Sequence, residues 1–393
     1  MTGPGQPPFR AAERDFLSDA VRLEHAPDGG VRYFRADDPE GEEYTYRKPF
    51  ILELEITRRC NLKCLHCYAE AGPSDFSDEL TLEEIGAVLD DARAAGMREL
   101  SLTGGEVMTH PRFMDIVDAG FERGFNVRFV TNATLLDDAI LEGLRARPIK
   151  LITVSLDAVT PEAHERIRGP GTHAPAVEGI DRLVGAGMRL SVITAFSEIN
   201  VGEFDALLEF CVSRGLDWQV QMTSAKGRCA RGITLSPEGY YALGEKVAAA
   251  FAADLPVNVI PMDDLATFSH FEPLARLSST WQGRCTGGLL NIFVRANGDV
   301  TPCSALAFDE CVAGNVRTDG LARILEEERC RRVLYWAHEE PLRGVCAECP
   351  FAAECNGGCP EILLCMCTDR RENEYCYHRI EQERILKEAI GDE

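Results

Sequence analysis

Basic residues are scarce in this chain of 393 residues. It carries 41 Lys and Arg against 64 Asp and Glu, so its formal net charge is −23 at neutral pH. An acidic surface repels phosphate backbones, which argues against nucleic acid as a partner. Long apolar runs are missing as well. None approaches the roughly 20 residues that a membrane-spanning helix needs, so we expect no membrane segment.

The amino-terminal residues lack the pattern of a signal peptide. Met1–Phe16 has no apolar core flanked by basic residues, so we expect a cytoplasmic protein. Disulfides are disfavoured in that compartment. The sixteen cysteines, an unusual number, are therefore better interpreted as metal ligands.

The length fits two domains, and the sequence pattern changes twice along the chain. Residues 1–48 are rich in Pro, Gly and charge, and we predict a short amino-terminal extension with one hairpin. In residues 49–260, strands alternate with helices, which indicates a parallel sheet. Residues 261–393 break this alternation and hold eleven of the sixteen cysteines. They are predicted to form a separate cysteine-rich domain.

Six strand–helix steps are predicted between residues 49 and 260. Six units are too few to close an eight-stranded barrel, so the expected fold is α/β, an open, partial (β/α)6 TIM-like barrel. Parallel strands place functional loops at their carboxyl ends. The predicted strands are Phe50–Ile56, Glu99–Thr103, Asn126–Thr131, Lys150–Ser155, Arg189–Thr194 and Asp217–Met222.

Three cysteines follow the first predicted strand directly. Cys60, Cys64 and Cys67 form a CxxxCxxC run. Each iron of a four-iron cubane needs one thiolate, so three thiolates leave the fourth iron open for chemistry. A zinc site is the alternative. Zinc usually takes CxxC pairs and four ligands, and no fourth ligand with zinc-like spacing lies nearby.

This run resembles the cluster motif of radical S-adenosylmethionine (SAM) enzymes, in which an aromatic residue usually precedes the third cysteine. His66 stands in that place here. Gly104-Gly105-Glu106, at the end of the second strand, resembles the family's GGE motif. The resemblance implies that this segment holds the amino group of SAM. Val107 follows where the family often has proline.

Two further segments resemble SAM-contacting parts of the same family. Asn132 lies at the end of the third strand, and Ser155 and Asp157 lie at the end of the fourth. The resemblance implies that Ser155 and Asp157 contact the ribose hydroxyls. A helix cap is the alternative role for Asp157, because Asp is favoured at that position.

The carboxy-terminal cysteines resemble the seven-cysteine SPASM domain, which binds auxiliary iron–sulfur clusters. The resemblance implies two such clusters, and a zinc ribbon is the alternative for Cys346–Cys359. No cysteine occurs shortly before Cys285, so the inner cluster either has an open iron or is completed by Cys311. The implied outer ligands are Cys346, Cys349, Cys355 and Cys376, and the implied inner ligands are Cys285, Cys303 and Cys359.

The resemblance also implies the reaction. SAM is cleaved reductively to a 5′-deoxyadenosyl radical, which abstracts a hydrogen atom and leads to crosslinking or desaturation of a ribosomally made peptide. The alternative is a dehydrogenase or epimerase acting on a small molecule such as an aminocyclitol. Cys229, Cys365 and Cys367 are then candidate hydrogen donors. The reductant would be a flavodoxin or ferredoxin, and a separate peptide-binding protein is left open.

Overall fold

The computed structural model describes residues 49–74, 77–262, 265, 267–272, 274–278, 285 and 287–390, and the backbone of two amino-terminal strands. Met1–Phe16 and the cysteine-free residues 279–284 lie outside the described residues. The chain divides into two units, Met1–Arg47 and Lys48–Glu393. In the first unit, β1 (Val21–His25) pairs antiparallel with β2 (Val31–Arg35), which is the hairpin that the sequence predicts.

The centre of the second unit is a parallel sheet in which all six predicted strands are present. Each pairs with the next in chain order, so the polar residues that follow the strands meet at one end of the sheet. These strands are β3 (Ile51–Glu55), β4 (Glu99–Thr103), β5 (Asn126–Thr131), β6 (Leu151–Ser155), β7 (Leu190–Phe196) and β8 (Asp217–Met222).

Four more strands extend this sheet at its two edges. β9 (Val259–Pro261) pairs parallel with β8, and β10 (Asn291–Val294) pairs parallel with β3. β11 (Asp299–Thr301) and β12 (Gly314–Asn315) follow β10 in antiparallel pairing. The carboxy-terminal third therefore contributes three strands to the barrel sheet, and the boundary near residue 260 stays a prediction.

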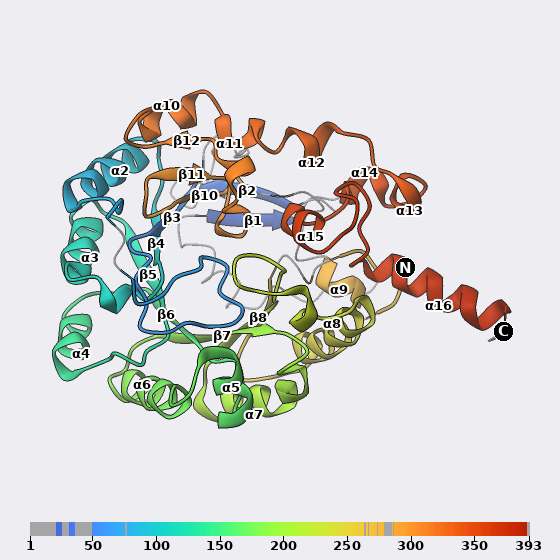
Figure 1. Cartoon of the computed structure of the whole chain (residues 1–393), viewed down its shortest axis with the longest axis horizontal. Coiled ribbons are helices and arrows are strands. Elements are labelled where there is room, and N and C mark those ends of the chain that lie inside the picture. The colour runs from blue at the N-terminus through green and yellow to red at the C-terminus, as the bar shows by residue number, and fades with distance from the viewer. Residues whose placement is uncertain are drawn as a thin grey trace. The chain divides into compact units, whose positions relative to one another are not determined.

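Helices surround the outside of the curved sheet (Figure 1). A capping box begins the first helix of the second unit, where Thr81 and Glu84 exchange side-chain and backbone hydrogen bonds. Trp218 is fully buried against Phe204 and Phe196, which fastens the helix that begins at Phe204 to the sheet. The helices are α2 (Leu82–Ala94), α3 (Phe113–Glu122), α4 (Asp138–Arg145), α5 (Pro161–Arg168), α6 (His173–Gly185), α7 (Phe204–Arg214) and α8 (Pro237–Ala252), with 3-10 turns at Val107–Thr109, Val201–Glu203 and Arg231–Ile233.

The cysteine-rich region consists mainly of short helices. Its last helix projects away from the sheet in Figure 1 and is anchored at its start, where the Tyr377 ring stacks on Tyr240 at a centroid distance of 4.8 Å. No helix among the described residues is both long enough and apolar enough to span a bilayer. The helices are α9 (Leu274–Ser278), α10 (Leu321–Glu326), α11 (Arg329–Arg332), α12 (Tyr335–Glu339), α13 (Gly344–Ala347), α14 (Ala352–Cys355), α15 (Pro360–Cys365) and α16 (Tyr377–Ile390), with 3-10 turns at Ser304–Leu306 and Asp309–Cys311.

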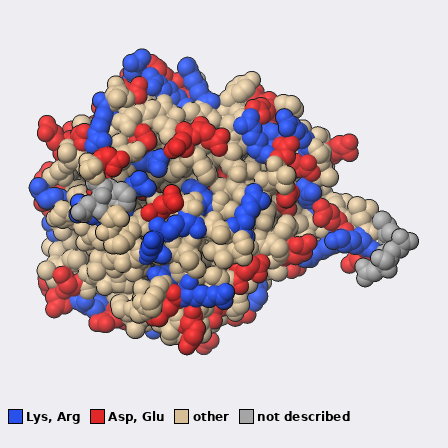
Figure 2. All heavy atoms as spheres, in the orientation of Figure 1, with Lys and Arg blue, Asp and Glu red and all other residues tan. Residues whose placement is uncertain are grey.

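Charge is mixed over the face of the molecule shown in Figure 2. Acidic and basic side chains lie side by side there, so the surplus of acidic residues is not gathered into one patch on this face. Among the described residues, several ion pairs lie at the surface, for example Arg112 with Asp115 and Lys246 with Asp205. Exposed pairs of this kind contribute at most about 1 kcal/mol each to stability.

Candidate active site

The three cysteines of the CxxxCxxC run lie in the loop that follows β3, which we call the cluster loop. The loop closes on itself where the backbone N–H of Cys60 donates to the carbonyl of Gly72 at 2.8 Å. Burial, together with Glu106, Cys64 and Cys67, raises the pKa of the Cys60 thiol to about 12. Thiols that affect one another in this way lie close together. Metal binding must therefore displace protons from them.

The paired glycines at the end of β4 lie directly against this cluster loop. A Cβ atom on Gly104 would lie 2.5 Å from the Thr57 carbonyl oxygen, and one on Gly105 would lie 2.2 Å from that of Arg59. The N–H of Gly105 also donates to the Thr57 carbonyl at 2.7 Å. The two glycines are therefore approached closely by the backbone that leads into Cys60.

Glu106 connects the ends of β4 and β5. Its buried carboxylate accepts hydrogen bonds from the Thr131 hydroxyl at 2.7 Å, the Asn132 N–H at 2.7 Å and the Met108 N–H at 3.1 Å. Burial raises its pKa, although these bonds act in the opposite direction. The Asn132 amide nitrogen also lies 4.0 Å from the Cys60 sulfur. That Glu106 and Asn132 contact SAM stays a prediction.

Asp157, fully buried just after β6, is the centre of a charged network. Its carboxylate accepts hydrogen bonds from Arg168 Nε at 2.5 Å and from the Ala195 N–H at 3.2 Å, and it lies 2.8 Å from His66 Nε2. Burial acts to raise its pKa, but Arg168 and His66 more than offset this effect. The pKa of Asp157 is therefore well below its usual range. The network ties the cluster loop to β6.

The sequence left two roles open for Asp157, and the helix cap is not the one observed. Thr160 occupies the N-cap position of α5, and the Asp157 carboxylate points instead to the network described above. Ser155 is half-buried at the last position of β6. Contact of Ser155 and Asp157 with the ribose of SAM stays a prediction.

His164 is buried next to this network, where its ring accepts a hydrogen bond from the Asp157 N–H. Its burial leads us to expect that the stability of the protein depends on pH. Burial, assisted by the Arg168 charge, lowers its pKa from 6.5 to about 4. Between these values only the unfolded chain binds the proton, so stability is complete above pH 6.5 and falls as the pH drops towards 4. A His164→Gln variant keeps an acceptor for the Asp157 N–H but cannot titrate.

We therefore expect wild type to lose roughly 3 kcal/mol more unfolding free energy than His164→Gln between pH 6.5 and pH 4. Anaerobic urea denaturation at several pH values measures this difference. Parallel pH profiles for the two proteins would contradict a neutral buried imidazole.

The four cysteines assigned to an outer auxiliary cluster come together at α13, α14 and the start of α16. Burial raises the pKa of Cys376, and Cys355, Cys346 and Cys349 raise it further. Burial and the two neighbouring thiols likewise raise the pKa of Cys355 to about 12. These mutual effects place the four thiols near one another, and their role as ligands of one cluster stays a prediction.

Three cysteines assigned to an inner cluster form a second group. Burial raises the pKa of Cys359, and Cys285 and Cys303 are among the groups that raise it further. Cys311 packs in an apolar cluster beside Cys285 and Cys303. Burial and Glu310 raise the pKa of Cys311 to about 11. Its role as a fourth ligand stays a prediction.

Two of the three candidate hydrogen donors are neighbours. Burial raises the pKa of Cys365 to about 12, and Glu361 and Cys229 contribute to the rise. Cys367 instead donates towards the Asn373 carbonyl oxygen, with its sulfur 3.6 Å away. Cys229, in the segment after β8, and Cys365, at the end of α15, are therefore near each other, and a catalytic role for any of the three stays a prediction.

Sequence reasoning missed Lys226, which follows β8 and is buried. Its Nζ donates to the carbonyls of Ser304, at 3.1 Å, and Ala305. It also lies 4.7 Å from the ring centroid of Tyr68 and 4.9 Å from that of Phe308. Lys226 thus joins the cluster loop to the segment beside Cys303. The only signal in the sequence is a lysine placed just after the last central strand.

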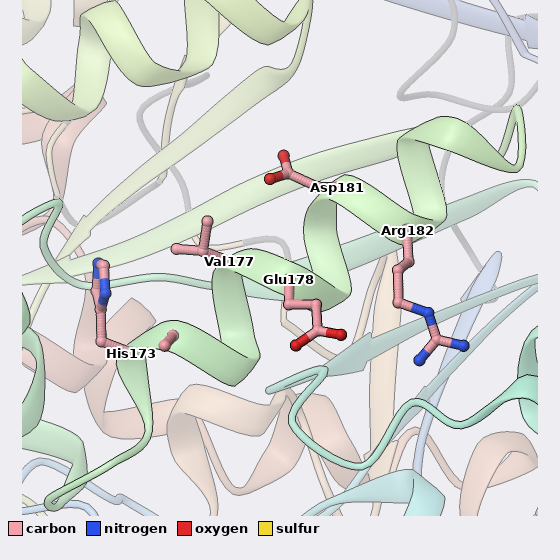
Figure 3. A pocket seen from close by; sticks show the side chains of 6 residues that line it. His173, Val177, Glu178, Asp181 and Arg182 are labelled. Carbon is pink, nitrogen blue, oxygen red and sulfur yellow. The ribbon is translucent and has the colours of Figure 1, made fainter.

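A hollow of about 600 Å³ runs along α6, on the outside of the barrel (Figure 3). All of its lining residues come from this one helix, and none of them is a predicted site residue. The hollow is therefore separate from the candidate active site. Its lining residues are His173, Ala174, Val177, Glu178, Asp181 and Arg182.

Comparison with known families agrees with this arrangement. Residues 54–211 match the radical SAM superfamily, and residues 285–350 match the SPASM iron–sulfur cluster-binding domain. The chain is a radical SAM protein with a SPASM domain. Its cofactors are SAM and iron–sulfur clusters.

Several relatives of this radical SAM–SPASM protein span most of its length. The AdoMet-dependent heme synthase of Methanosarcina barkeri is 29% identical, and the alignment covers 84% of this chain and 97% of the relative. The mycofactocin maturase MftC of Mycobacterium ulcerans is 27% identical over 81% and 84% of the two chains. The antilisterial bacteriocin subtilosin biosynthesis protein AlbA of Bacillus subtilis is 27% identical over 79% and 67%.

Two solved structures share the fold of the radical SAM–SPASM protein. Streptococcus suis SuiB bound to the precursor peptide SuiA has a TM-score of 0.67 at 17% identity, covering 84% of this chain and 75% of SuiB. Native anSMEcpe with bound AdoMet has a TM-score of 0.66 at 16% identity, covering 88% of this chain and 100% of that one. At these identities the similarity concerns the fold.

The three groups of thiols fit the cofactors of a radical SAM–SPASM protein. Within the described ranges, no three His, Cys, Asp or Glu side chains converge on a point that could hold a single metal ion. A cubane does not need such convergence, because each thiolate binds a different iron. Cys60, Cys64 and Cys67 would hold the cluster that binds SAM, and the two carboxy-terminal groups would hold the auxiliary clusters.

Proposed function

We propose that this protein oxidises a ribosomally made peptide, forming a crosslink or a double bond. One observation carries the proposal. The segment that holds the inner group of cysteines contacts the barrel near the cluster loop. The N–H of Ser304, next to Cys303, donates to Glu53 on β3 at 3.2 Å. Lys226 bridges the same segment to Tyr68. An electron acceptor would therefore lie beside the site of hydrogen abstraction.

The relatives support a peptide as the substrate. MftC is named a maturase, AlbA is named for bacteriocin biosynthesis, and SuiB was solved with a precursor peptide. Cys60, Cys64 and Cys67 would hold the cluster that, with SAM, supplies the 5′-deoxyadenosyl radical, and the carboxy-terminal cysteines would hold auxiliary clusters able to accept an electron. Asp157 and His66 hold the cluster loop in place for this chemistry, and Glu106 holds the neighbouring turn.

The proposal includes two protein partners. A flavodoxin or ferredoxin would supply the electron that reduces the cluster. A separate peptide-binding protein, which the sequence leaves open, would present the substrate.

The test is the accurate mass of short peptides encoded beside the gene, after anaerobic co-expression in deuterated medium. Loss of two hydrogens from one peptide is the expected result. A Cys60→Ala variant lacks one cluster ligand and should leave that peptide unchanged. Unchanged composition with one deuterium gained at carbon would indicate an epimerase. No change in any peptide would contradict a peptide substrate.

A small-molecule substrate is the second candidate, as a dehydrogenase or epimerase acting on, for example, an aminocyclitol. The alignment with the M. barkeri heme synthase, which covers 97% of that relative, favours a substrate that is not a peptide. The two candidates differ in which added substrate stimulates the formation of 5′-deoxyadenosine. Stimulation by a small molecule, with none by any encoded peptide, would favour this second reaction.

A further inference from the structure

The segment that follows β8 contacts the cluster loop through hydrogen bonds and close backbone packing. The backbone N–H of Arg228 donates to the Cys67 carbonyl at 3.1 Å, and its side-chain Nε donates to the Cys64 carbonyl at 3.1 Å. Gly227 has a φ of +58°, and a Cβ there would lie 2.5 Å from the carbonyl oxygens of Cys67 and Tyr68. Two hydrogen bonds and this close backbone contact fix the Arg228 guanidinium beside Cys64 and Cys67.

One donor of this guanidinium remains unused. Arg228 Nη2 is buried and has no hydrogen-bond partner among the residues that the structure describes. Buried polar groups normally have partners, and a buried charged donor without one calls for an anionic acceptor. The acceptor must lie close to the cysteines. Burial raises the pKa of Cys64, and the charges of Arg168 and Arg228 both oppose that rise.

The two arginines near Cys64 differ in how they are neutralised. Arg168 Nε donates to the buried carboxylate of Asp157 at 2.5 Å. Arg228 instead donates from Nε to a neutral carbonyl. Its positive charge is therefore available to an anionic group held by the cluster loop.

We propose that Arg228 donates a hydrogen bond to the iron–sulfur centre held by Cys60, Cys64 and Cys67 and thereby raises its reduction potential. A donor to a cluster sulfur stabilises the reduced state more, because that state carries more negative charge. The inference rests on the radical SAM cofactor and not on a peptide substrate. A failure to find a modified peptide would leave it testable.

The test compares wild-type holoenzyme with an Arg228→Met variant, reconstituted anaerobically to the same iron content. Redox titration is followed by electron paramagnetic resonance, using the signal that changes when SAM is added, because SAM binds the cluster with the open iron. We expect reduction of this cluster to become about tenfold less favourable, a midpoint about 59 mV more negative. Arg231→Met removes an equal charge three residues away, and its midpoint should match wild type.

An unchanged midpoint in Arg228→Met at full iron content would overturn the proposal. This holds even if the affinity for SAM falls, since that result would assign the donor to the SAM carboxylate. Where Arg228→Met fails to load iron, Arg228→Lys keeps the charge and one anchoring donor. Its midpoint should move in the same direction by less, and an unchanged midpoint there would equally overturn the proposal.

Discussion

A Gly105→Ala variant is expected to lose SAM cleavage by about a hundredfold or more, because shifts of about 1 Å at a reacting centre have effects of that size. The added methyl group would lie 2.2 Å from the Arg59 carbonyl oxygen and 2.6 Å from its carbon. These are backbone atoms of the residue before Cys60, so they can yield only by moving the cluster loop. Formation of 5′-deoxyadenosine under reducing conditions measures the loss, and iron content shows whether the cluster is still bound.

Gly72→Ala is the matched control. Gly72 lies in the same loop and its carbonyl accepts from the Cys60 N–H, but a Cβ there would meet nothing within 4 Å. We expect its SAM cleavage to remain near wild type. Equal losses in the two variants would mean that the loop tolerates no added methyl group at all, and the close contact at Gly105 would then have no special role.

The fold was predictable wherever local pattern and local packing agree. The six central strands are apolar runs separated by helical stripes, and all six occur in the structure. β10 was missed because it is only four residues long and its partner, β3, lies about 240 residues earlier in the chain. α5 received no predicted range because half of its eight residues are charged, and only Pro161 at its first turn signals a helix.

The site was predictable as motifs but not as contacts. The CxxxCxxC run and the paired glycines are local patterns that spacing alone discloses. The contact of Arg228 with the Cys64 carbonyl spans 164 residues, and that of Lys226 with Ser304 spans 78. No local pattern encodes such partners. The motif also could not show that the Glu106 carboxylate is engaged by Thr131 and by the N–H of Asn132.

An Asp157→Asn variant is expected to lose about 3–5 kcal/mol of unfolding free energy, the usual cost of breaking a buried ion pair by removing one partner. The side chain of Asp157 is fully buried and that of Arg168 is 11% exposed, so the guanidinium would be left without its counter-charge and with little water. His66 would lose the same carboxylate, and the cluster loop would lose its tie to β6. Anaerobic urea denaturation measures the loss, and we expect iron loading to fall with it.

Asp118→Asn is the matched control, because it removes the same charge from an arginine–aspartate pair that is more exposed. Asp118 accepts two hydrogen bonds of 2.6 Å from Arg147, but its side chain is 43% exposed. Water can replace the lost partner there, so we expect a cost below about 1 kcal/mol and normal iron loading. The two substitutions are chemically identical, and both break an arginine–aspartate pair. If they destabilised the protein equally, burial could not be what makes Asp157 the anchor of the cluster loop, and the cause would have to lie in local backbone contacts such as that of the Ala195 N–H.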